Sequence, residues 1–409
     1  MMIAFFLAPV YILVNIYIYW RIMGWLQVGF SQLKDRKNRI VPVAVYLFFA
    51  FSFLIAFLLP SGQLRRAMKL IGNYWLGVLL YIIFFIVLFD LLRLFFLYVL
   101  HIDREKLCSP KMHRRVGRFC ACAILIITVG GVINAGIIRV TPYEIAIDKA
   151  SQNPNVRSEM KVVLAADLHL GYNIGIRQME KMVEKINEQD ADLVVFAGDI
   201  FDNEWEAVQE PEKLEEILRG IRSRYGVYAC YGNHDVEEPI LAGFTFRQTE
   251  EKNSSPEMDK FLKDAGITLL RDEGIMLENG VYLFGRADAS RPGGGIKSRQ
   301  TPEQITENIA GDVPVLVIDH EPSQLGELAD AGVDVDLCGH THDGQIFPGN
   351  LVVKLAWENS YGYLKKKNMH NIVTSGAGLF GPNMRVATKA EICPITIYFD
   401  GNTSDRTPE

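Results

Sequence analysis

The first third of the chain is a series of long apolar runs separated by short basic loops. Each run is close to the length of about 20 apolar residues that an α-helix needs to cross a bilayer. The pattern therefore predicts four membrane-spanning helices, at Met2–Trp20, Val41–Leu59, Tyr74–Leu100 and Phe119–Ile138. The first run has neither a basic start nor a small-residue cleavage site, so we expect it to be retained rather than removed as a signal peptide.

From Lys161 onward, short apolar runs alternate with amphipathic stretches. Ile174–Gln189 carries apolar side chains at helical spacing, which predicts a helix with one buried face. Similar helices are predicted at Pro211–Arg222, Met258–Ala265 and Pro322–Ala329. A buried strand is predicted within Lys161–His169, an apolar run that ends in Asp-x-His, and further strands at Asp192–Ala197, Gly226–Tyr231, Val313–Ile318, Val333–Cys338, Ile372–Thr374 and Ile395–Phe399. Strands that alternate with helices predict an α/β domain.

A polar stretch with two prolines, Arg139–Met160, joins the two parts of the chain. Its composition predicts a strand that leads into the domain, followed by a linker. We therefore expect a transmembrane region at residues 1–140 and a linker at residues 141–158. The α/β domain would follow at residues 159–402, with a polar tail at residues 403–409.

The bulk composition fits this division and excludes several classes of protein. The 409 residues are 49% hydrophobic, with a net charge of −6 and a mean hydropathy of +0.11. Nothing strongly basic marks the second half, so no nucleic-acid partner is expected. The six cysteines show no disulfide framework, and we interpret those in strand-like runs as buried free thiols.

Basic residues in the loops predict the orientation in the membrane. The first and third loops between the apolar runs carry five and six Lys or Arg residues, and the second carries three. Because cytoplasmic loops are enriched in Lys and Arg, both the N-terminus and the α/β domain are expected to be extracytoplasmic. Asp90 and Arg93 interrupt the third run. We interpret them as a mutually neutralising pair near a helix end rather than as a functional site.

Polar side chains follow five of the predicted strands, at the point where each strand ends. They are Asp167 and His169, Asp199 and Asp202, Asn233 and His234, His320, and finally His340 and His342. Ligands of open α/β sheets bind outside the carboxyl ends of the strands, so these side chains are expected to meet. Carboxylate, imidazole and amide donors suit two divalent ions such as Mn, Fe or Zn. Gly198, Gly232 and Gly339 precede three of the groups and would allow sharp turns there.

These groups form the ordered series Asp-x-His, Gly-Asp-x-x-Asp, Gly-Asn-His-Asp, His and Gly-His-x-His. The series resembles the calcineurin-like metallophosphoesterase superfamily over Lys161–Phe399. The segments GHTHDGQI and SGAGLFGPNMR are further similar to its membrane-anchored bacterial branch, which includes lipid-sugar diphosphatases and cell-envelope phosphoesterases. Asp343 departs from that branch, which usually has glycine there. The resemblance implies a central β-sandwich flanked by helices.

The resemblance also implies a role for each residue. Asp167, His169 and His342 would hold the first metal, while Asn233, His320 and His340 would hold the second. Asp199 would bridge the two ions. His234, oriented by Asp202, would stabilise or protonate the leaving oxygen. A hydroxide held between the ions would attack phosphorus in line, without a covalent enzyme intermediate.

The sequence offers several candidate substrates. Arg385 and Arg286 are candidate phosphate-binding residues, because guanidinium groups match phosphate geometry. A lipid-linked phosphate or diphosphate suits a domain tethered at a bilayer, and apolar residues at the mouth would favour it; the candidates are Phe244, Phe246, Phe347 and Phe380. The alternatives are a soluble phosphodiesterase or nucleotidase, and a membrane sensor or transporter with a phosphoesterase-like binding head. His370 follows three lysines and is expected on a solvated rim.

Overall fold

The computed structural model describes residues 2–149, 159–237, 240–241, 244–245 and 254–399. Phe246, the end of the predicted linker, residues 400–402 and the predicted tail at 403–409 lie outside the described residues, as does the side chain of Phe244. The contacts divide the chain into two units, one formed mainly by residues 1–133 and one that begins at Asn134. The domain boundaries given above stay a prediction.

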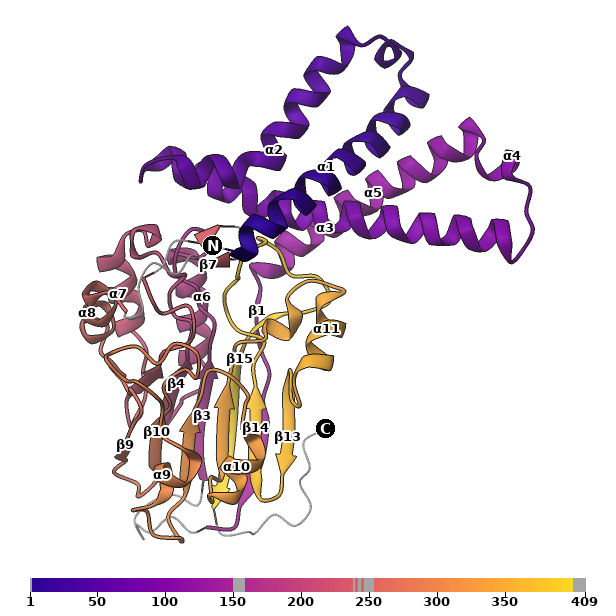
Figure 1. Cartoon of the computed structure of the whole chain (residues 1–409). Coiled ribbons are helices and arrows are strands. Elements are labelled where there is room, and N and C mark those ends of the chain that lie inside the picture. The colour runs from indigo at the N-terminus through magenta and orange to yellow at the C-terminus, as the bar shows by residue number, and fades with distance from the viewer. Residues whose placement is uncertain (1, 150–158, 238–239, 242–243, 246–253, 400–409) are drawn as a thin grey trace. The chain divides into compact units, whose positions relative to one another are not determined.

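The first unit consists of long apolar helices (Figure 1). They are α1 (Met2–Gly29), α2 (Ile40–Leu58), α3 (Gln63–Tyr98) and α5 (Pro110–Ala135). Short helices lie in the connections: η1 (Ser31–Lys34), η2 (Lys37–Arg39) and α4 (Arg104–Leu107). Among the described residues, three helices are long and apolar enough to cross a membrane, at Lys37–Leu58, Gln63–Tyr98 and Pro110–Ala135. The fourth predicted span lies within α1 and stays a prediction.

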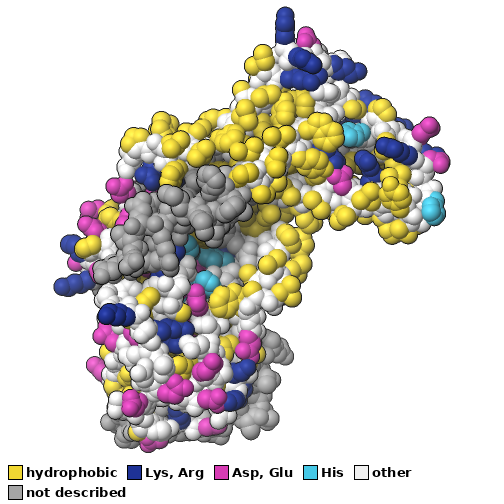
Figure 2. All heavy atoms as spheres, in the orientation of Figure 1, with side chains coloured by type: hydrophobic (Ala, Val, Ile, Leu, Met, Phe, Trp, Pro, Cys, Tyr) yellow, Lys and Arg dark blue, Asp and Glu magenta, His cyan; other side chains and the backbone are white. Residues whose placement is uncertain are grey.

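Helices α1, α2 and α3 share a small core. Ile18, Ala50 and Leu79 are buried in it, and the Tyr46 hydroxyl donates to Asn15 Oδ1 at 2.8 Å. Many other large apolar side chains of these helices are exposed, and they dominate the surface of the helices in Figure 2. Exposed apolar surface of this extent is what a lipid environment requires of a helix.

Asp90 in α3 has a different partner from the one predicted. Asp90 Oδ2 accepts hydrogen bonds from Arg21 Nη1 at 2.5 Å and from the Tyr17 hydroxyl at 2.8 Å. The predicted ion pair with Arg93 is therefore replaced by a pair between two helices. Spacing within one helix cannot reveal a partner on α1, because that contact depends on how the helices pack.

The second unit is built on two mixed β-sheets (Figure 1). The first sheet has the order β1-β15-β3-β4-β5-β8, with β2 also paired to β15. Its strands are β1 (Ile138–Val140), β2 (Tyr143–Ile147), β3 (Glu159–Ala165), β4 (Leu193–Ala197), β5 (Val227–Cys230), β8 (Ile267–Leu269) and β15 (Ala390–Phe399). The strands β3, β4, β5 and β8 are parallel, whereas β15 runs antiparallel to β3.

The second sheet has the order β13-β14-β12-β11-β10-β9. Its strands are β9 (Glu273–Met276), β10 (Tyr282–Gly285), β11 (Val315–Ile318), β12 (Val335–Cys338), β13 (Gly362–Lys366) and β14 (Met369–Val373). The four central strands are parallel, and the two edge strands are antiparallel to them. A short hairpin is formed by β6 (Ile240–Leu241) and β7 (Phe244–Thr245).

The alternation of side chains along β3 explains the layers. Val162 and Leu164 point into a core shared by both sheets, whereas Val163 points into a core beneath helices. That outer core contains α6 (Ile176–Asn187), α7 (Pro211–Arg219) and α8 (Pro256–Asp264). On the other side, α9 (Pro302–Thr306) and α10 (Leu325–Asp330) cover the second sheet. The α/β class is confirmed, with a β-sandwich flanked by helices.

The last turn of α5 belongs to this second unit. Ala135 is buried in the core beneath α6. Asn134 Nδ2 donates to the carbonyl oxygens of Arg385 at 3.0 Å and of Thr388 at 2.8 Å. Only two residues, Gly136 and Ile137, separate α5 from β1. The domain is therefore tied to the end of an apolar helix by side-chain contacts as well as by the chain itself.

His370 lies on β14 and is buried, contrary to its predicted place on a solvated rim. Its Nε2 hydrogen-bonds the Ala146 carbonyl at 2.9 Å, and its Nδ1 lies 3.0 Å from the Tyr363 hydroxyl. The lysines before it belong to the neighbouring strand β13 and its turn, so they do not indicate the exposure of His370. Burial, followed by the nearby Lys365 ammonium, lowers the pKa of His370 to about 4.

This burial predicts a pH-dependent contribution to stability. Between the ordinary pKa of 6.5 and about 4, the unfolded chain binds a proton at His370 that the folded chain does not. The contribution is therefore complete above pH 6.5 and is lost as the pH falls. The free energy of unfolding of the wild type should fall when the pH is lowered from 7 to 5. In His370→Gln we expect this fall to be smaller by about 1–2 kcal/mol. Urea titration of the full chain in detergent, with exposed His101→Gln as control, measures this. An identical pH dependence in wild type and His370→Gln would contradict it.

Candidate metal centre

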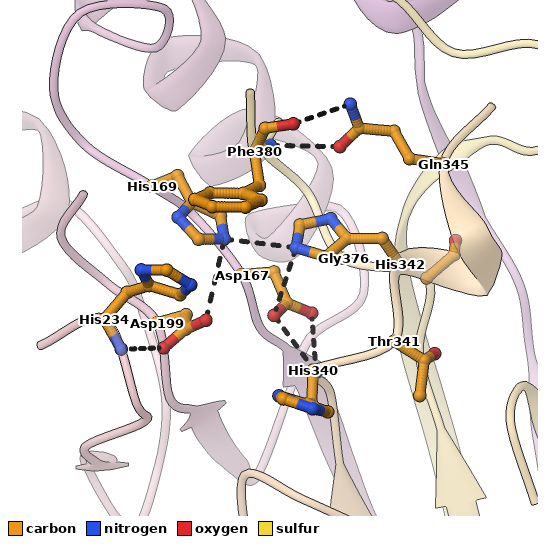
Figure 3. A network of polar contacts seen from close by, with 12 residues as sticks. Asp167, His169, Asp199, His234, His340, Thr341, His342, Gln345, Gly376 and Phe380 are labelled. Carbon is orange, nitrogen blue, oxygen red and sulfur yellow. Dashed lines mark hydrogen bonds and ion pairs between the residues drawn. The ribbon is translucent and has the colours of Figure 1, made fainter. Parts of the chain in front are cut away.

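The predicted ligands come together at one end of the two sheets. They lie on the loops that follow β3, β4 and β5 in the first sheet and β11 and β12 in the second. The carboxyl ends of these five strands meet at the same edge, so ligands far apart in the sequence become neighbours. Figure 3 shows the side chains of Asp167, His169, Asp199 and His342 directed toward one another, with His234 and His340 beside them.

The first cluster consists of Asp167, His169 and His342. One potential ligand atom from each lies within 4.8 Å of the others, and all three side chains are buried. The two Nε2 atoms of His169 and His342 are 3.1 Å apart. His342 Nε2 also lies 3.6 Å from Asp167 Oδ1. These residues are the three that the family resemblance assigns to the first metal.

The second cluster contains Asn233, His320 and His340. His320 Nε2 lies 3.1 Å from Asn233 Oδ1 and 3.2 Å from His340 Nδ1. Asp199 Oδ2 is 3.1 Å from His320 Nε2 and 3.7 Å from His169 Nε2. Asp199 therefore lies between the two clusters, in the position of a bridging carboxylate.

The donor set fits a pair of divalent ions. Ligand atoms about 2.1 Å from an ion, at angles near 90–110°, are about 3.0–3.5 Å apart. The separations given above, from 3.1 to 3.7 Å, are close to this range. The two buried carboxylates of Asp167 and Asp199 also call for positive charge at the centre. The oxygen and nitrogen donors suit Mn, Fe or Zn.

The pKa values of the four predicted ligand imidazoles shift in opposite directions: those of His340 and His342 are lowered, whereas those of His169 and His320 are raised. Burial, followed by the charge of His320, lowers the pKa of His340 to about 4. Burial likewise lowers the pKa of His342 well below its ordinary value. A metal ligand must present a free lone pair, and neutral imidazole does so without competition from a proton. Burial raises the pKa of Asp167 to about 6, which shows how costly this uncompensated carboxylate is.

Unusual backbone geometry occurs at most of the predicted ligands. Five of them have a positive φ: Asp167 at 52°, His169 at 47°, Asp199 at 50°, His340 at 74° and His342 at 52°. Left-handed conformations are costly for residues with a Cβ and persist only where the surrounding structure imposes them. Such strain is typical of functional sites, and here it turns each ligand back toward the centre immediately after its strand.

Two glycines permit the close approach of these loops. A Cβ on Gly339 would lie 2.6 Å from Ala166 Cβ and 2.7 Å from Asp167 Oδ2. Gly198 has a φ of 76°, and a Cβ there would lie 2.5 Å from His320 Nδ1. Both glycines are therefore required by the packing of the metal ligands, as the sequence predicted from their positions.

His234 has a different polar partner from the one predicted. Its backbone amide donates to Asp199 Oδ1 at 2.8 Å, and its Nδ1 forms a short contact with Asn203 Oδ1. Asp202 instead directs its Oδ1 to His169 Nδ1, 3.7 Å away. The residue that contacts the His234 ring is therefore Asn203, one position after the predicted Asp202. Asn203 carries no sequence signal of its own, because the family motif points to the aspartate before it.

This contact predicts that Asn203 positions His234. We expect Asn203→Ala to reduce kcat by about 10–100-fold with little change in KM, because the imidazole loses its fixed orientation. Asn203→Asp should restore most of the activity, since a carboxylate oxygen can also accept from Nδ1. Steady-state kinetics with the exposed Asn308→Ala as control tests this. Wild-type kcat in Asn203→Ala would show that His234 needs no such partner.

Both candidate phosphate-binding arginines are fully buried and engaged by the protein. Arg385 Nη2 donates to the carbonyl oxygens of Ser375 at 2.6 Å and Gly378 at 2.9 Å. Arg286 Nη1 donates to Asp319 Oδ2 at 2.7 Å, and its Nη2 donates to Gln324 at 2.8 Å. In this arrangement the guanidinium groups hold loops rather than face an open site. Their substrate-binding role stays a prediction.

Phe380 packs against two imidazoles of the predicted centre. Its ring centroid lies 4.4 Å from that of His234 and 5.3 Å from that of His169. Gln345 fixes the Phe380 backbone, accepting from its amide and donating to its carbonyl, both at 2.9 Å (Figure 3). An apolar ring is therefore held against two of the imidazoles.

Comparisons with known proteins agree with the motifs. Residues 160–344 match the family model of the calcineurin-like phosphoesterases, which confirms the predicted resemblance. An uncharacterized metallophosphoesterase of Helicobacter pylori is 30% identical over 57% of this chain and 58% of its own length. A transmembrane protein with a metallophosphoesterase domain from Danio rerio is 25% identical over 96% of this chain and 88% of its own length.

Two further proteins are similar to this chain. A metallophosphoesterase of Bacillus subtilis is 27% identical over 70% of this chain and 98% of its own length. Among solved structures, the NAD nucleotidase of Haemophilus influenzae is similar, with a TM-score of 0.35, 13% identity, and coverage of 54% of this chain and 46% of that one. The chain spans 58% of the length of the Helicobacter pylori relatives that it matches.

Proposed function

We propose that this chain, which belongs through residues 160–344 to the calcineurin-like phosphoesterases, is a membrane-anchored hydrolase of phosphoester or diphosphate bonds. The observation that carries the proposal is the convergence of seven oxygen and nitrogen donors from five strand ends on one edge of the domain. They are Asp167, His169, Asp199, Asn233, His320, His340 and His342. A binuclear phosphoesterase centre explains why donors of these types meet there at these spacings.

Each residue has a distinct task in this proposal. The two clusters would hold one divalent ion each, and such ions supply Lewis acidity to the phosphoryl group and an activated water. Asp199, between the clusters, fixes their separation. Asn203 Oδ1 can only accept, so its contact keeps a proton on His234 Nδ1 and leaves Nε2 for the substrate. His234 would then stabilise or protonate the leaving oxygen.

A lipid-linked or cell-envelope phosphate or diphosphate is the proposed substrate. The helices in the same chain support it, because they keep the domain at a bilayer where lipid head groups are concentrated. The Phe380 ring against His169 and His234 adds an apolar contact for such a molecule. The proposed topology has four spans, with both the N-terminus and the domain outside the cell, as the basic loops indicate.

Hydrolysis by the purified full chain tests the proposal. The chain in detergent would be given Mn, Fe or Zn and three substrates: an aryl phosphodiester, an aryl phosphomonoester and a lipid-linked diphosphate. We expect metal-dependent hydrolysis, fastest for the lipid-linked diphosphate, and its loss after treatment with a chelator. Faster hydrolysis of the aryl phosphodiester would favour a soluble substrate. No hydrolysis of any of the three by metal-loaded protein would contradict the proposed activity.

A further inference from the structure

One short helix of the phosphoesterase domain exposes its apolar side chains. No residue of α11 (Gly349–Ala356) is buried. The exposed fractions are 53% for Leu351, 61% for Val352 and 90% for Leu355. Single exposed apolar residues are ordinary on protein surfaces, whereas several on one helix mark an interaction surface. Figure 2 shows hydrophobic side chains gathered where α11 lies in Figure 1, beside histidines drawn in cyan.

This surface is unusual within its unit. In the part of the chain from Asn134 onward that the structure describes, the other strongly exposed large hydrophobic residues are Ile137 and Met276. Ile137 lies in the two-residue connection between α5 and β1. Apart from Met276 on β9, the exposed large hydrophobic residues are therefore those of α11 and of the connection from α5.

Helix α11 adjoins the metal centre. It begins five residues after Gly344, the last residue of the short helix η4 (His342–Gly344), which contains a metal ligand. Trp357 directly follows α11, and its ring centroid lies 5.1 Å from that of His340. A surface that contacts α11 therefore lies at the edge of the metal centre.

Helix α11 is also connected to the end of α5 by contacts within the same unit. Asn134, in the last turn of α5, hydrogen-bonds the carbonyl oxygens of Arg385 and Thr388. The Thr388 hydroxyl in turn donates to the carbonyl of Gln345 at 2.7 Å, four residues before α11. This chain of contacts places α11 at the edge of the domain where the apolar helix enters it.

We propose that α11 inserts its apolar side chains into the head-group boundary of the lipid bilayer that holds α5. α5 is long and apolar enough to cross a membrane, and only two residues separate it from β1, so the bilayer surface lies within reach of this edge. The exposed Lys354 on the same helix suits anionic head groups, with its stem along the apolar surface. Docked in this way, α11 would hold the mouth of the metal centre at the level of lipid phosphates. The inference rests on the membrane anchoring in the proposed function and not on its chemistry.

Depth-dependent quenching tests this placement without any assay of activity. An environment-sensitive fluorophore is attached at Leu355→Cys in the full chain, after the cysteines at 108, 120 and 122 are changed to serine. The matched control carries the label at Met276→Cys. In phosphatidylcholine vesicles with spin-labelled acyl chains, the label on α11 is expected to be quenched and the control label is not. Absence of quenching at Leu355→Cys, or equal quenching at both positions, would overturn the proposal. If the label at Leu355→Cys is shielded from solvent in detergent and the chain forms a dimer, α11 contacts a second copy of the chain. That result would also overturn the proposal.

A kinetic comparison separates this inference from the proposed function. Leu355→Glu is expected to lower kcat/KM for a lipid-linked diphosphate in vesicles by about tenfold, the equivalent of one apolar side chain removed from lipid. Hydrolysis of a water-soluble aryl phosphodiester should stay unchanged, as should both reactions in Met276→Glu. Equal rates for Leu355→Glu and the wild type on the lipid substrate would overturn the proposal. Failure of the wild type on every substrate would instead contradict the proposed function, while the quenching result would still stand.

Discussion

Replacing Asp199 with asparagine is expected to reduce kcat/KM for every hydrolysed phosphate substrate by at least about a thousandfold. Asp199 Oδ2 lies 3.1 Å from His320 Nε2 and 3.7 Å from His169 Nε2, so this carboxylate is close to a ligand of each cluster. Asparagine keeps the shape of the side chain but removes its charge and one anionic oxygen. The two ions would then lose their common ligand and part of the charge that offsets their mutual repulsion.

The control for this variant is Asp312→Asn, which makes the same chemical change at an exposed position of the domain. Initial rates at saturating and limiting substrate, with metal in excess, separate a loss of catalysis from a loss of binding. A rate for Asp199→Asn within tenfold of the wild type would contradict the assignment of Asp199 as the bridging ligand.

Replacing Arg385 with methionine is expected to lower the free energy of unfolding of the domain by about 3–5 kcal/mol. The buried guanidinium donates to the carbonyl oxygens of Ser375, Gly376 and Gly378. The Gly378 amide in turn donates to the Asp167 carbonyl at 2.8 Å. Methionine fills a similar volume but removes the Arg385 donor from the carbonyls of Ser375 and Gly378, whereas the Gly376 carbonyl still accepts from the Glu391 amide at 3.0 Å. The loop behind the first metal ligand would then lose its support.

The same variant separates two roles for Arg385. If it supports the loop, as its contacts indicate, Arg385→Met should unfold at lower urea and bind less metal. If it were a phosphate-binding residue, KM would rise while the unfolding transition stayed in place. The exposed Arg222→Met serves as the matched control. Urea titration and elemental analysis of the same preparations distinguish the two outcomes.

Local sequence pattern was sufficient to predict the strands and the clustering of the predicted ligands at their ends. Four of the five motifs lie directly after a run of apolar residues, and the fifth follows the alternating segment Val333–Cys338, so both the strand and its polar end are encoded within about ten residues of sequence. The parallel arrangement of β3, β4 and β5 follows from their alternation with helices. As a result, Asp167, Asp199 and the histidines could be assigned to one edge before any contact was known.

Contacts between distant segments could not be predicted in this way. The pairing of Asp90 with Arg21 depends on the packing of α1 against α3, and sequence spacing favoured Arg93. The burial of His370 depends on β2 reaching β14, which no local signal indicates. The sequence does not indicate Asn203, because Asp202 and Asn203 are neighbours on one loop. Asn203 contacts His234, whereas Asp202 faces His169.

The most direct test of the account is the metal content of the full chain as purified, measured by elemental analysis against protein concentration. Two divalent ions per chain are predicted for the wild type, and fewer than two for Asp199→Asn, in which the shared carboxylate is removed. One ion or none in a folded wild-type chain, after incubation with Mn, Fe and Zn in turn, would contradict a binuclear centre at this edge of the domain.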